Sequence, residues 1–252
     1  MGQVFDKRLA MLYEAWQNSP EGMLLDRLST DLIIRLIQPK RGHRVLDIGC
    51  GTGNHLLLFC RLGLDVTGLD ASPYMVDTAR SRLGHKACLK IGRAEELPFD
   101  DNEFDLSTLI LTLEFLDDPL AALREAGRVT KDIIFLGVLN SLSFGYIGNK
   151  LNALFRNSIF REVHSFTLWE LKGLVKKAYG NVPMEWGSAR TLPFLSNHYA
   201  KSIERSSLLQ SYPYGTFLGL ACKMTYTLKT KTLTVTERLK KGAESITGSP
   251  SF

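Results

Sequence analysis

Three glycines follow an aspartate in the stretch VLDIGCGTG, residues 45–53, and this pattern could bind a ligand through the main chain. Asp47 is followed by Gly49, Gly51 and Gly53. Glycine permits positive φ and has no Cβ to keep a ligand away from the backbone. A helix that begins near residue 53 would add unpaired N–H groups and a positive dipole end. The loop suits either a nucleotide pyrophosphate or the amino-acid part of a cofactor.

The spacing of the glycines separates these two ligands. A dinucleotide-binding loop has the pattern G-x-G-x-x-G, whereas this chain has G-C-G-T-G. Asp47 would repel a pyrophosphate in a partly desolvated pocket, but it would attract an ammonium group. The loop therefore favours a zwitterionic amino acid over a phosphate, and a nicotinamide oxidoreductase is disfavoured.

A second carboxylate, Asp70, ends the next apolar run, GLD, about twenty residues further on. At the end of a parallel strand, a carboxylate can accept hydrogen bonds from both hydroxyls of a ribose. Asp70 could instead cap the following helix, but Ser72 already fills that role ahead of Pro73.

Alternating strand and helix patterns predict the scaffold that positions these residues. Runs such as IIFLGVL are apolar throughout, as in parallel strands that are buried on both faces. Ser72-Pro73 and Asp118-Pro119 are typical helix starts. The pattern predicts a doubly wound α/β sheet. We expect strands at 44–48, 65–69, 87–91, 104–110 and 132–139, and helices at 53–62, 72–83, 118–128 and 168–179.

The two ends of the chain differ from this alternation. Two helices are expected at 5–17 and 22–37, and two late strands, 182–189 and 215–230, are expected to pair antiparallel at the sheet edge. The predicted organisation is a helical lid at 1–40, a main domain at 41–237 with a lid insertion at 141–166, and a polar tail at 238–252. Residues 5–28, 141–166 and 190–214 are expected to close over the strand ends.

Composition limits the class of protein. The 252 residues are 44% hydrophobic and 23% charged, and no apolar run approaches the roughly 20 residues of a membrane-spanning helix. The amino terminus lacks the apolar core of a signal peptide. The four cysteines form no CxxC pair, so we expect a reduced, cytoplasmic protein without a metal site. The net charge of +5 is scattered, which indicates a solvated basic surface rather than nucleic-acid binding.

Four motifs together resemble the class I S-adenosylmethionine-dependent methyltransferases, and in particular the type 11 branch, which includes many quinone and small-molecule methylases. They are VLDIGCGTG (45–53), GLDASPYMVDTAR (68–80), GRAEELPFDDNEFD (92–105) and LTLEFLDDPLAALREAGRV (111–129). The leader YEAWQNSPEGMLLDRL (13–28) resembles that branch as well. The resemblance implies a Rossmann-like fold, with a mostly parallel seven-stranded sheet, an antiparallel edge strand and a helical lid.

The resemblance also implies a site for S-adenosylmethionine. Asp47 and the glycine loop would hold the methionine part, Asp70 the ribose, and Ala71 and Met75 the adenine surroundings. The family often has an aspartate directly after Gly92, where this chain has Arg93, so either the Glu95 side chain or the Ala94 backbone would contact the adenine amino group. The implied cofactor-binding set is Asp47, Gly49, Cys50, Gly51, Gly53, Asp70, Ala71, Met75, Ala94, Glu95 and Leu111.

The implied function is methyl transfer to a small, partly apolar or aromatic acceptor, with S-adenosylhomocysteine as product. A sulfonium methyl is already a strong electrophile, so we expect positioning to dominate catalysis. Glu114, Tyr13 and His164 are candidates for acceptor contact or proton removal, although Glu114 could equally be a capping or surface carboxylate and His164 a solvated loop residue. The alternative function is a cofactor-binding protein without transfer activity that serves as a partner or scaffold.

Overall fold

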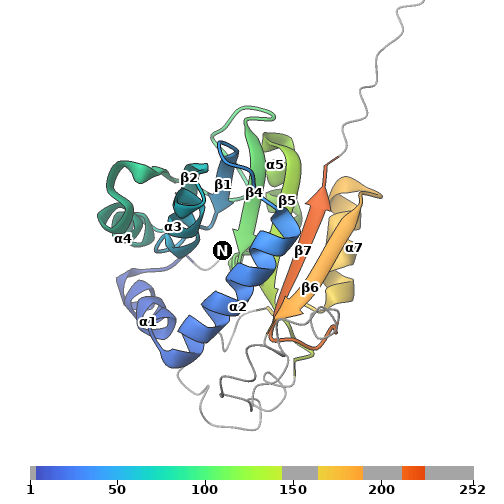
Figure 1. Ribbon diagram of the computed structural model, residues 1–252, viewed down its shortest axis with the longest axis horizontal. Helices are drawn as coiled ribbons and strands as arrows, with labels where there is room; N and C mark the ends of the chain where they lie inside the picture. The colour runs from blue at the N-terminus through green and yellow to red at the C-terminus, as the bar shows by residue number, and fades with distance from the viewer. Residues whose placement is uncertain (1–3, 144–163, 190–211, 225–252) are drawn as a thin grey trace, which may run out of the picture.

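The computed structural model of the protein describes residues 4–143, 164–189 and 212–224, and its centre is a seven-stranded sheet. The strand order is β3-β2-β1-β4-β5-β7-β6 (Figure 1). Strands β1 to β5 run parallel, and β7 is antiparallel to both β5 and β6. The predicted mostly parallel sheet with an antiparallel pair at its edge is confirmed. The strands are β1 Arg44–Ile48, β2 Asp65–Asp70, β3 Cys88–Ile91, β4 Phe104–Ile110, β5 Thr130–Leu139, β6 Met184–Ala189 and β7 Phe217–Lys223.

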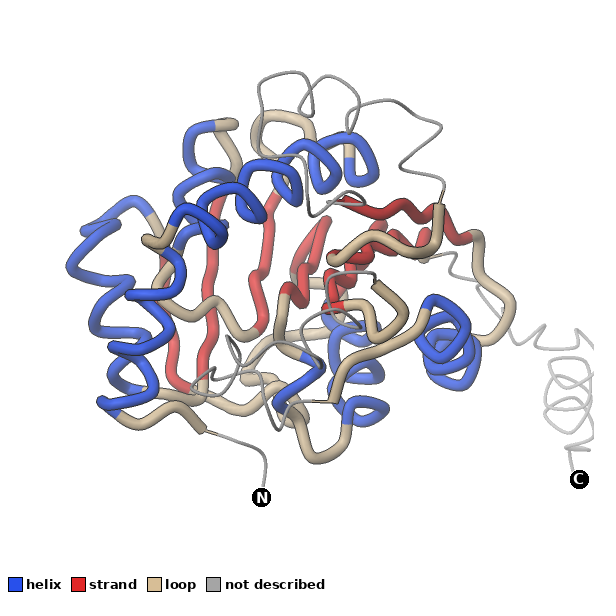
Figure 2. Tube along the Cα trace, turned by 90° about the horizontal axis from the view of Figure 1, so that it is seen from below, coloured by secondary structure: helices blue, strands red, loops and turns tan. Residues whose placement is uncertain are grey.

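Helices cover both faces of this sheet (Figure 2). One apolar cluster joins α2 and α3 to the sheet through residues such as Leu32 and Phe59, and a second joins α5 and α7 through Leu123 and Leu171. Burial on both faces explains why the parallel strands read as continuous apolar runs. The helices are α1 Lys7–Gln17, α2 Pro20–Ile37, α3 Asn54–Arg61, α4 Pro73–Leu83, α5 Pro119–Val129 and α7 Leu168–Tyr179, with short 3-10 turns η1 Gly84–Lys86 and η2 Leu113–Phe115.

Polar side chains fix where these helices begin. Ser72 caps α4 by accepting the Met75 N–H at 3.3 Å, and Asp118 caps α5 at its first turn. Thr167 and Glu170 form a reciprocal capping box at the start of α7. Ser72 and Asp118, the capping residues predicted from the sequence, therefore fix where the helices after β2 and β4 begin.

Several expected boundaries differ from the structure or lie outside its described residues. The expected last strand, 215–230, is observed as β7, Phe217–Lys223. Most of the expected lid segments, 144–163 and 190–211, and the polar tail 238–252 lie outside the described residues. Within the described parts of the chain, no helix has the length and apolarity needed to cross a membrane.

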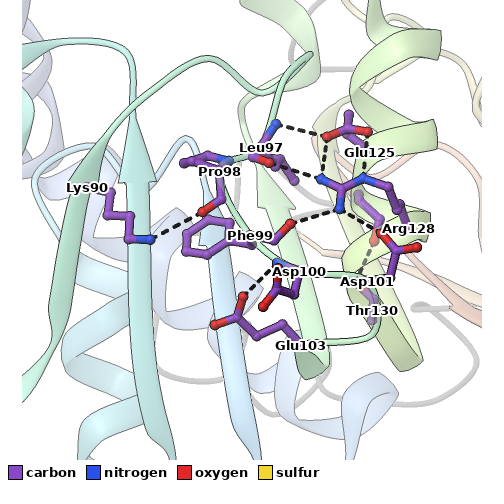
Figure 3. A network of polar contacts seen from close by, with 11 residues as sticks. Lys90, Leu97, Pro98, Phe99, Asp100, Asp101, Glu103, Glu125, Arg128 and Thr130 are labelled. Atoms are coloured by element: carbon purple, nitrogen blue, oxygen red, sulfur yellow. Dashed lines mark hydrogen bonds and ion pairs between the residues drawn. The ribbon is translucent and has the colours of Figure 1, made fainter.

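Arg128 in α5 holds the connection between β3 and β4 (Figure 3). Its guanidinium donates to the carbonyl oxygens of Leu97 and Phe99, at 2.9 and 2.8 Å. It also pairs with Glu125 at 2.7 Å and with Asp101 at 2.8 Å. These contacts to charged and main-chain oxygens use the planar donor fork of arginine. They fix the connection whose first residues line the cavity described next.

Candidate functional site

A cavity lies at the carboxyl ends of β1, β2 and β4, which is where ligands bind in open α/β sheets. Helix α1 contributes Tyr13 and Gln17 to its wall. Its volume is about 100 Å³. The sequence-predicted residues that line it are Tyr13, Gly49, Cys50, Gly51, Asp70, Ala71, Met75, Ala94, Glu95 and Leu111.

The cavity wall also includes residues that the sequence did not single out. Most of them are apolar or aromatic. Several, such as Leu69 and Thr112, lie inside the motifs quoted from the sequence, but only the fold shows that they reach the cavity. They are Val4, Phe5, Gln17, Asn54, Leu69, Ile110, Thr112, Phe115 and Leu116.

The glycine loop follows β1, and all three of its glycines have positive φ: +75° at Gly49, +53° at Gly51 and +83° at Gly53. A Cβ at Gly49 would collide with the Thr112 side chain, and one at Gly53 would crowd a side chain of α4 at 2.9 Å. At Gly51 the nearest atom would be Tyr13 Cε1, 4.0 Å away. Gly49 and Gly53 therefore serve close packing, whereas Gly51 leaves room on the cavity side.

Asp70 ends β2 and lines the cavity. One carboxylate oxygen accepts the Gly51 N–H at 2.9 Å, and the other accepts the Ser72 N–H at 2.8 Å. Burial raises the pKa of Asp70, and these two hydrogen bonds oppose that shift. A carboxylate offers about four lone-pair sites, so each oxygen keeps capacity for a ligand. Ser72, and not Asp70, is the N-cap of α4, and the role of Asp70 in ribose binding stays a prediction.

Asp47 lies in β1 beneath the glycine loop and does not line the cavity. It is 1% exposed and accepts a hydrogen bond from the Thr108 hydroxyl at 2.6 Å. Burial raises the pKa of Asp47 to about 7, against the lowering effect of the Thr108 hydrogen bond. The strand register pairs Asp47 with Thr108 across β1 and β4. Thr108 was not predicted, and only this register identifies it.

Glu114 lies in η2, directly after β4, and is 6% exposed. Its Oε1 accepts the N–H of Leu139, at the end of β5, at 2.7 Å. Its Oε2 is buried and has no hydrogen-bond partner among the residues that the structure describes. Burial raises the pKa of Glu114 to about 8. Glu114 is therefore a buried carboxyl between two strand ends, although it does not line the cavity.

Tyr13 lines the cavity from α1, within an aromatic cluster. Phe5 meets the ring of Tyr13 edge-on at 5.7 Å and that of Phe115 at 5.1 Å. The Phe5 carbonyl accepts a hydrogen bond from the Ser72 hydroxyl at 2.5 Å, which ties the segment ahead of α1 to the start of α4. The pKa of Tyr13 is raised, first by burial and then by the charge of Glu114, so its phenol stays neutral.

Two histidines, His55 and His164, occupy different places. His55 lines the cavity from α3, and burial lowers its pKa. His164 is exposed, packs edge-on against Phe166 with ring centroids 4.7 Å apart, and does not line the cavity. The structure does not bring His164 together with Tyr13 and Glu114.

Two polar contacts attach the rest of α1 to the site. Glu14 pairs with Arg82 of α4 at 3.1 Å. The Gln17 side chain accepts the Thr52 hydroxyl, in the glycine loop, at 2.8 Å. The helix predicted as part of a lid is thus tied to both the loop and α4.

The cavity wall after β3 includes Arg93, which stands where the family often has an aspartate. Arg93 lines the cavity and pairs with Glu95 at 3.4 Å and with Asp117 at 4.0 Å. Ala94 is buried beside them. Both alternatives for an adenine contact, the Glu95 side chain and the Ala94 backbone, therefore lie at the cavity wall. Among the described residues, no group of three or more potential metal ligands is found.

A mostly parallel sheet with this strand order and an antiparallel β7, a glycine loop after β1 and an acidic residue at the end of β2 define the class of Rossmann-like methyltransferases. Residues 46–133 match the family model of the type 11 methyltransferase domain. The match confirms the class predicted from the four motifs.

Curated relatives share this domain. The chain is 33% identical over 135 residues to the ubiquinone/menaquinone biosynthesis C-methyltransferase UbiE of Zymomonas mobilis, a match that covers 52% of this chain and 55% of that protein. It is 33% identical over 104 residues to a demethylmenaquinone methyltransferase of Staphylococcus carnosus. That match covers 39% of this chain and 43% of the other protein. The chain thus spans about half the length of the curated relatives it matches.

Solved structures show the same fold over more of the chain. An S-adenosylmethionine-dependent methyltransferase of Thermotoga maritima, described as a possible histamine N-methyltransferase, has a TM-score of 0.66 and 25% identity. That match covers 86% of this chain and 97% of the other. The [4+2]-cyclase SpnF has a TM-score of 0.61 and 20% identity, and the match covers 90% of this chain and 88% of the other. This likeness shows a shared fold.

Proposed function

We propose that this protein transfers a methyl group from S-adenosylmethionine to a small acceptor that is partly apolar or aromatic. The main support for the proposal is the hydrogen bond that the Gly51 N–H donates to the Asp70 carboxylate at the wall of the cavity. This contact places a carboxylate and an open stretch of main chain together at the end of the parallel strands, where the fold binds ligands.

The chemistry of the cavity fits this cofactor. Asp47 is buried and Asp70 half-buried, no cation lies beside either in the described residues, and loss of solvent raises the pKa of each. A cationic ammonium and sulfonium ligand would stabilise their charged forms. Met75 and Leu111 offer apolar surface for an adenine ring. When bound, S-adenosylmethionine supplies a methyl group on a positively charged sulfur.

The residues of this chain would then bind and orient. Asp70 would hold the ribose hydroxyls, Asp47 would act beneath the loop on the ammonium group, and Gly51 would let the loop approach the ligand closely. Holding an acceptor in line at near-attack distance supplies much of the barrier reduction that methyl transfer needs.

An acceptor that is partly apolar or aromatic is supported by the cavity wall formed by Phe5, Tyr13 and Phe115. Relatives named for quinone biosynthesis support it as well. A larger polymeric acceptor would need an open, charged groove. Tight and salt-sensitive binding of RNA or DNA in a gel-shift titration would contradict this part of the proposal.

Isothermal titration calorimetry with S-adenosylhomocysteine and with NAD tests the cofactor. We expect micromolar-range binding of S-adenosylhomocysteine and none of NAD. Asp70→Ala should weaken binding, while Asp77→Ala, which removes an exposed carboxylate of α4, is the matched control. An activity screen with labelled S-adenosylmethionine separates methyl transfer from the alternative, a binding protein that acts as a partner or scaffold.

We further propose the domain organisation stated above, with residues 1–40 and 141–166 as lid segments of the main domain at 41–237 and a tail at 238–252. A cytoplasmic location is proposed on the four free cysteines, because thiols persist in reducing compartments.

A further inference from the structure

The unpartnered oxygen of Glu114 is a feature that the cofactor site does not use. Buried polar atoms are nearly always hydrogen-bonded, and an exception calls for an explanation such as a missing ligand. Within residues 4–143, 164–189 and 212–224, Glu114 Oε2 is buried without a partner, although Oε1 of the same carboxyl accepts the Leu139 N–H at 2.7 Å. One oxygen thus anchors the side chain to β5, and the other is left for something else.

The surroundings of this oxygen hold no compensating charge in the described part of the chain. No ion pair there involves Glu114, and burial is the main cause that raises its pKa, opposed only by main-chain hydrogen bonds. Tyr13, which faces it from α1, is neutral. Asp70 and Asp47, at the neighbouring strand ends, are acidic as well. A cation is the ligand group that these carboxyls would stabilise most.

We propose that Glu114 binds the reacting group of the methyl acceptor, that this group is an amine, and that Oε2 accepts its proton. The inference rests on the proposed function. An N–H bond of the bound ammonium breaks, an O–H bond forms at Oε2, and the nitrogen keeps the electron pair. The resulting neutral amine has the lone pair that a nucleophile needs, and the proton later leaves Glu114 for solvent.

An amine fits these groups better than an anionic nucleophile. A phenolate, enolate or carboxylate would add a negative charge beside the buried carboxyl of Glu114, at a cost in a site of low polarity. Burial raises the pKa of Glu114, so its carboxylate is a stronger base toward the ammonium proton than an exposed carboxylate would be.

Access to Oε2 requires a shift of the cavity wall. Glu114 does not line the cavity, whereas its neighbour Phe115 and the facing Tyr13 do. Tyr13 belongs to α1, which is attached to the site by side-chain contacts such as Gln17 to Thr52. A movement of α1 would therefore open the way between the cavity and the carboxyl.

The experiment is a calorimetric titration of the full chain, saturated with S-adenosylhomocysteine, with three probes of one shape. These are benzylammonium, benzyl alcohol and benzoate. We expect benzylammonium to bind at least about tenfold more tightly than benzyl alcohol, and benzoate to bind weakest. Titrations in buffers of different ionisation enthalpy should show about one proton released on benzylammonium binding at neutral pH, because Glu114 loses its proton to form the ion pair.

Glu114→Gln is the test variant, since glutamine keeps the shape and the Oε1 contact to Leu139 but carries no charge. It should bind S-adenosylhomocysteine as the wild type does, lose the preference for the amine and release no proton. Glu96→Gln, at an exposed position outside the cavity lining, should behave as the wild type. Equal binding of amine and alcohol, no amine binding at millimolar concentration, or a preference that survives in Glu114→Gln would overturn the inference. Failure of S-adenosylhomocysteine to bind would instead overturn the proposed function.

Discussion

The carboxylate of Asp70 accepts the N–H of Gly51 at 2.9 Å, so the residue that ends β2 also fixes the loop that follows β1. The glycine loop and Asp70, which were expected to bind separate parts of a cofactor, are therefore joined in one hydrogen-bonded unit. A ligand that bonds to Asp70 acts on a carboxylate already oriented by Gly51 and Ser72. Such preorganisation reduces the entropy that binding must offset.

Substitution of Asp70 tests this unit directly. Asp70→Ala should weaken S-adenosylhomocysteine binding by about 2 kcal/mol or more, because the ligand loses charge-assisted hydrogen bonds and the loop loses its anchor. Asp70→Asn keeps one oxygen acceptor and should fall between the wild type and Asp70→Ala. Calorimetric dissociation constants provide the measurement. An affinity unchanged in Asp70→Ala would rule out the ribose assignment.

Gly49 and Gly51 should respond differently to the same change. Gly49→Ala places a methyl group against the Thr112 side chain and should lower the free energy of unfolding, by roughly 1–3 kcal/mol. Gly51→Ala meets no such obstacle and should cost only about 1–2 kcal/mol for its left-handed backbone. Its methyl group points to the cavity side, so its larger effect should be on S-adenosylhomocysteine affinity. Urea unfolding measures the stability of both variants, and calorimetry measures their affinity for S-adenosylhomocysteine. Normal ligand binding by Gly51→Ala would contradict the different roles assigned to the two glycines.

Helix α1 should act as a closing element over the cofactor. The cavity of about 100 Å³ is smaller than the roughly 300–1,000 Å³ of typical ligand sites, and α1 forms part of its wall, so we expect α1 to shift when a nucleoside-sized ligand binds. Glu14→Gln removes the charge that pairs with Arg82 and should speed both association and dissociation of S-adenosylhomocysteine in stopped-flow experiments. Asp77→Asn, which breaks an exposed pair within α4, is the control. Equal rates in Glu14→Gln and the wild type would show that this pair does not hold the helix.

Much of the fold follows from local patterns that the sequence displays. Apolar runs predict the parallel strands, and Ser72 and Asp118 predict helix starts, because each signal acts within a few residues. The glycine loop and Asp70 are equally local, so the cofactor wall could be predicted. The partners of Asp47 and Glu114 could not, since Thr108 and Leu139 come into contact only through strand register and the meeting of strand ends.

The same reason explains why the three catalytic candidates looked alike from the sequence. Glu114, Tyr13 and His164 are each a single polar residue near a predicted strand or lid. The fold gives them different surroundings: Glu114 is buried with a free oxygen, Tyr13 lines the cavity and His164 is exposed. Burial of a single side chain depends on segments far apart in the chain, which no short pattern records.

The last prediction concerns the pH dependence of stability. The pKa of Glu114 is about 8 in the folded protein and near 4.5 when the chain is unfolded. The folded state therefore holds this proton more tightly, so the contribution of Glu114 to stability is complete below the unfolded pKa and is lost as pH rises toward 8. Glu114→Gln cannot lose a proton. Relative to the wild type, it should gain stability by up to about 1.4 kcal/mol for each pH unit across this range.

Urea unfolding of the wild type and Glu114→Gln at several pH values between the two pKa values measures this difference. Asp47, whose pKa is also raised by burial, titrates in both proteins, so its effect cancels in the comparison. Glu96→Gln should follow the wild type at every pH, because its carboxylate is exposed. A wild type and a Glu114→Gln variant whose unfolding free energies stay a constant distance apart would show that Glu114 is ionised in the folded protein. Its buried oxygen would then already have a partner, and Glu114 would have no need of an incoming cation.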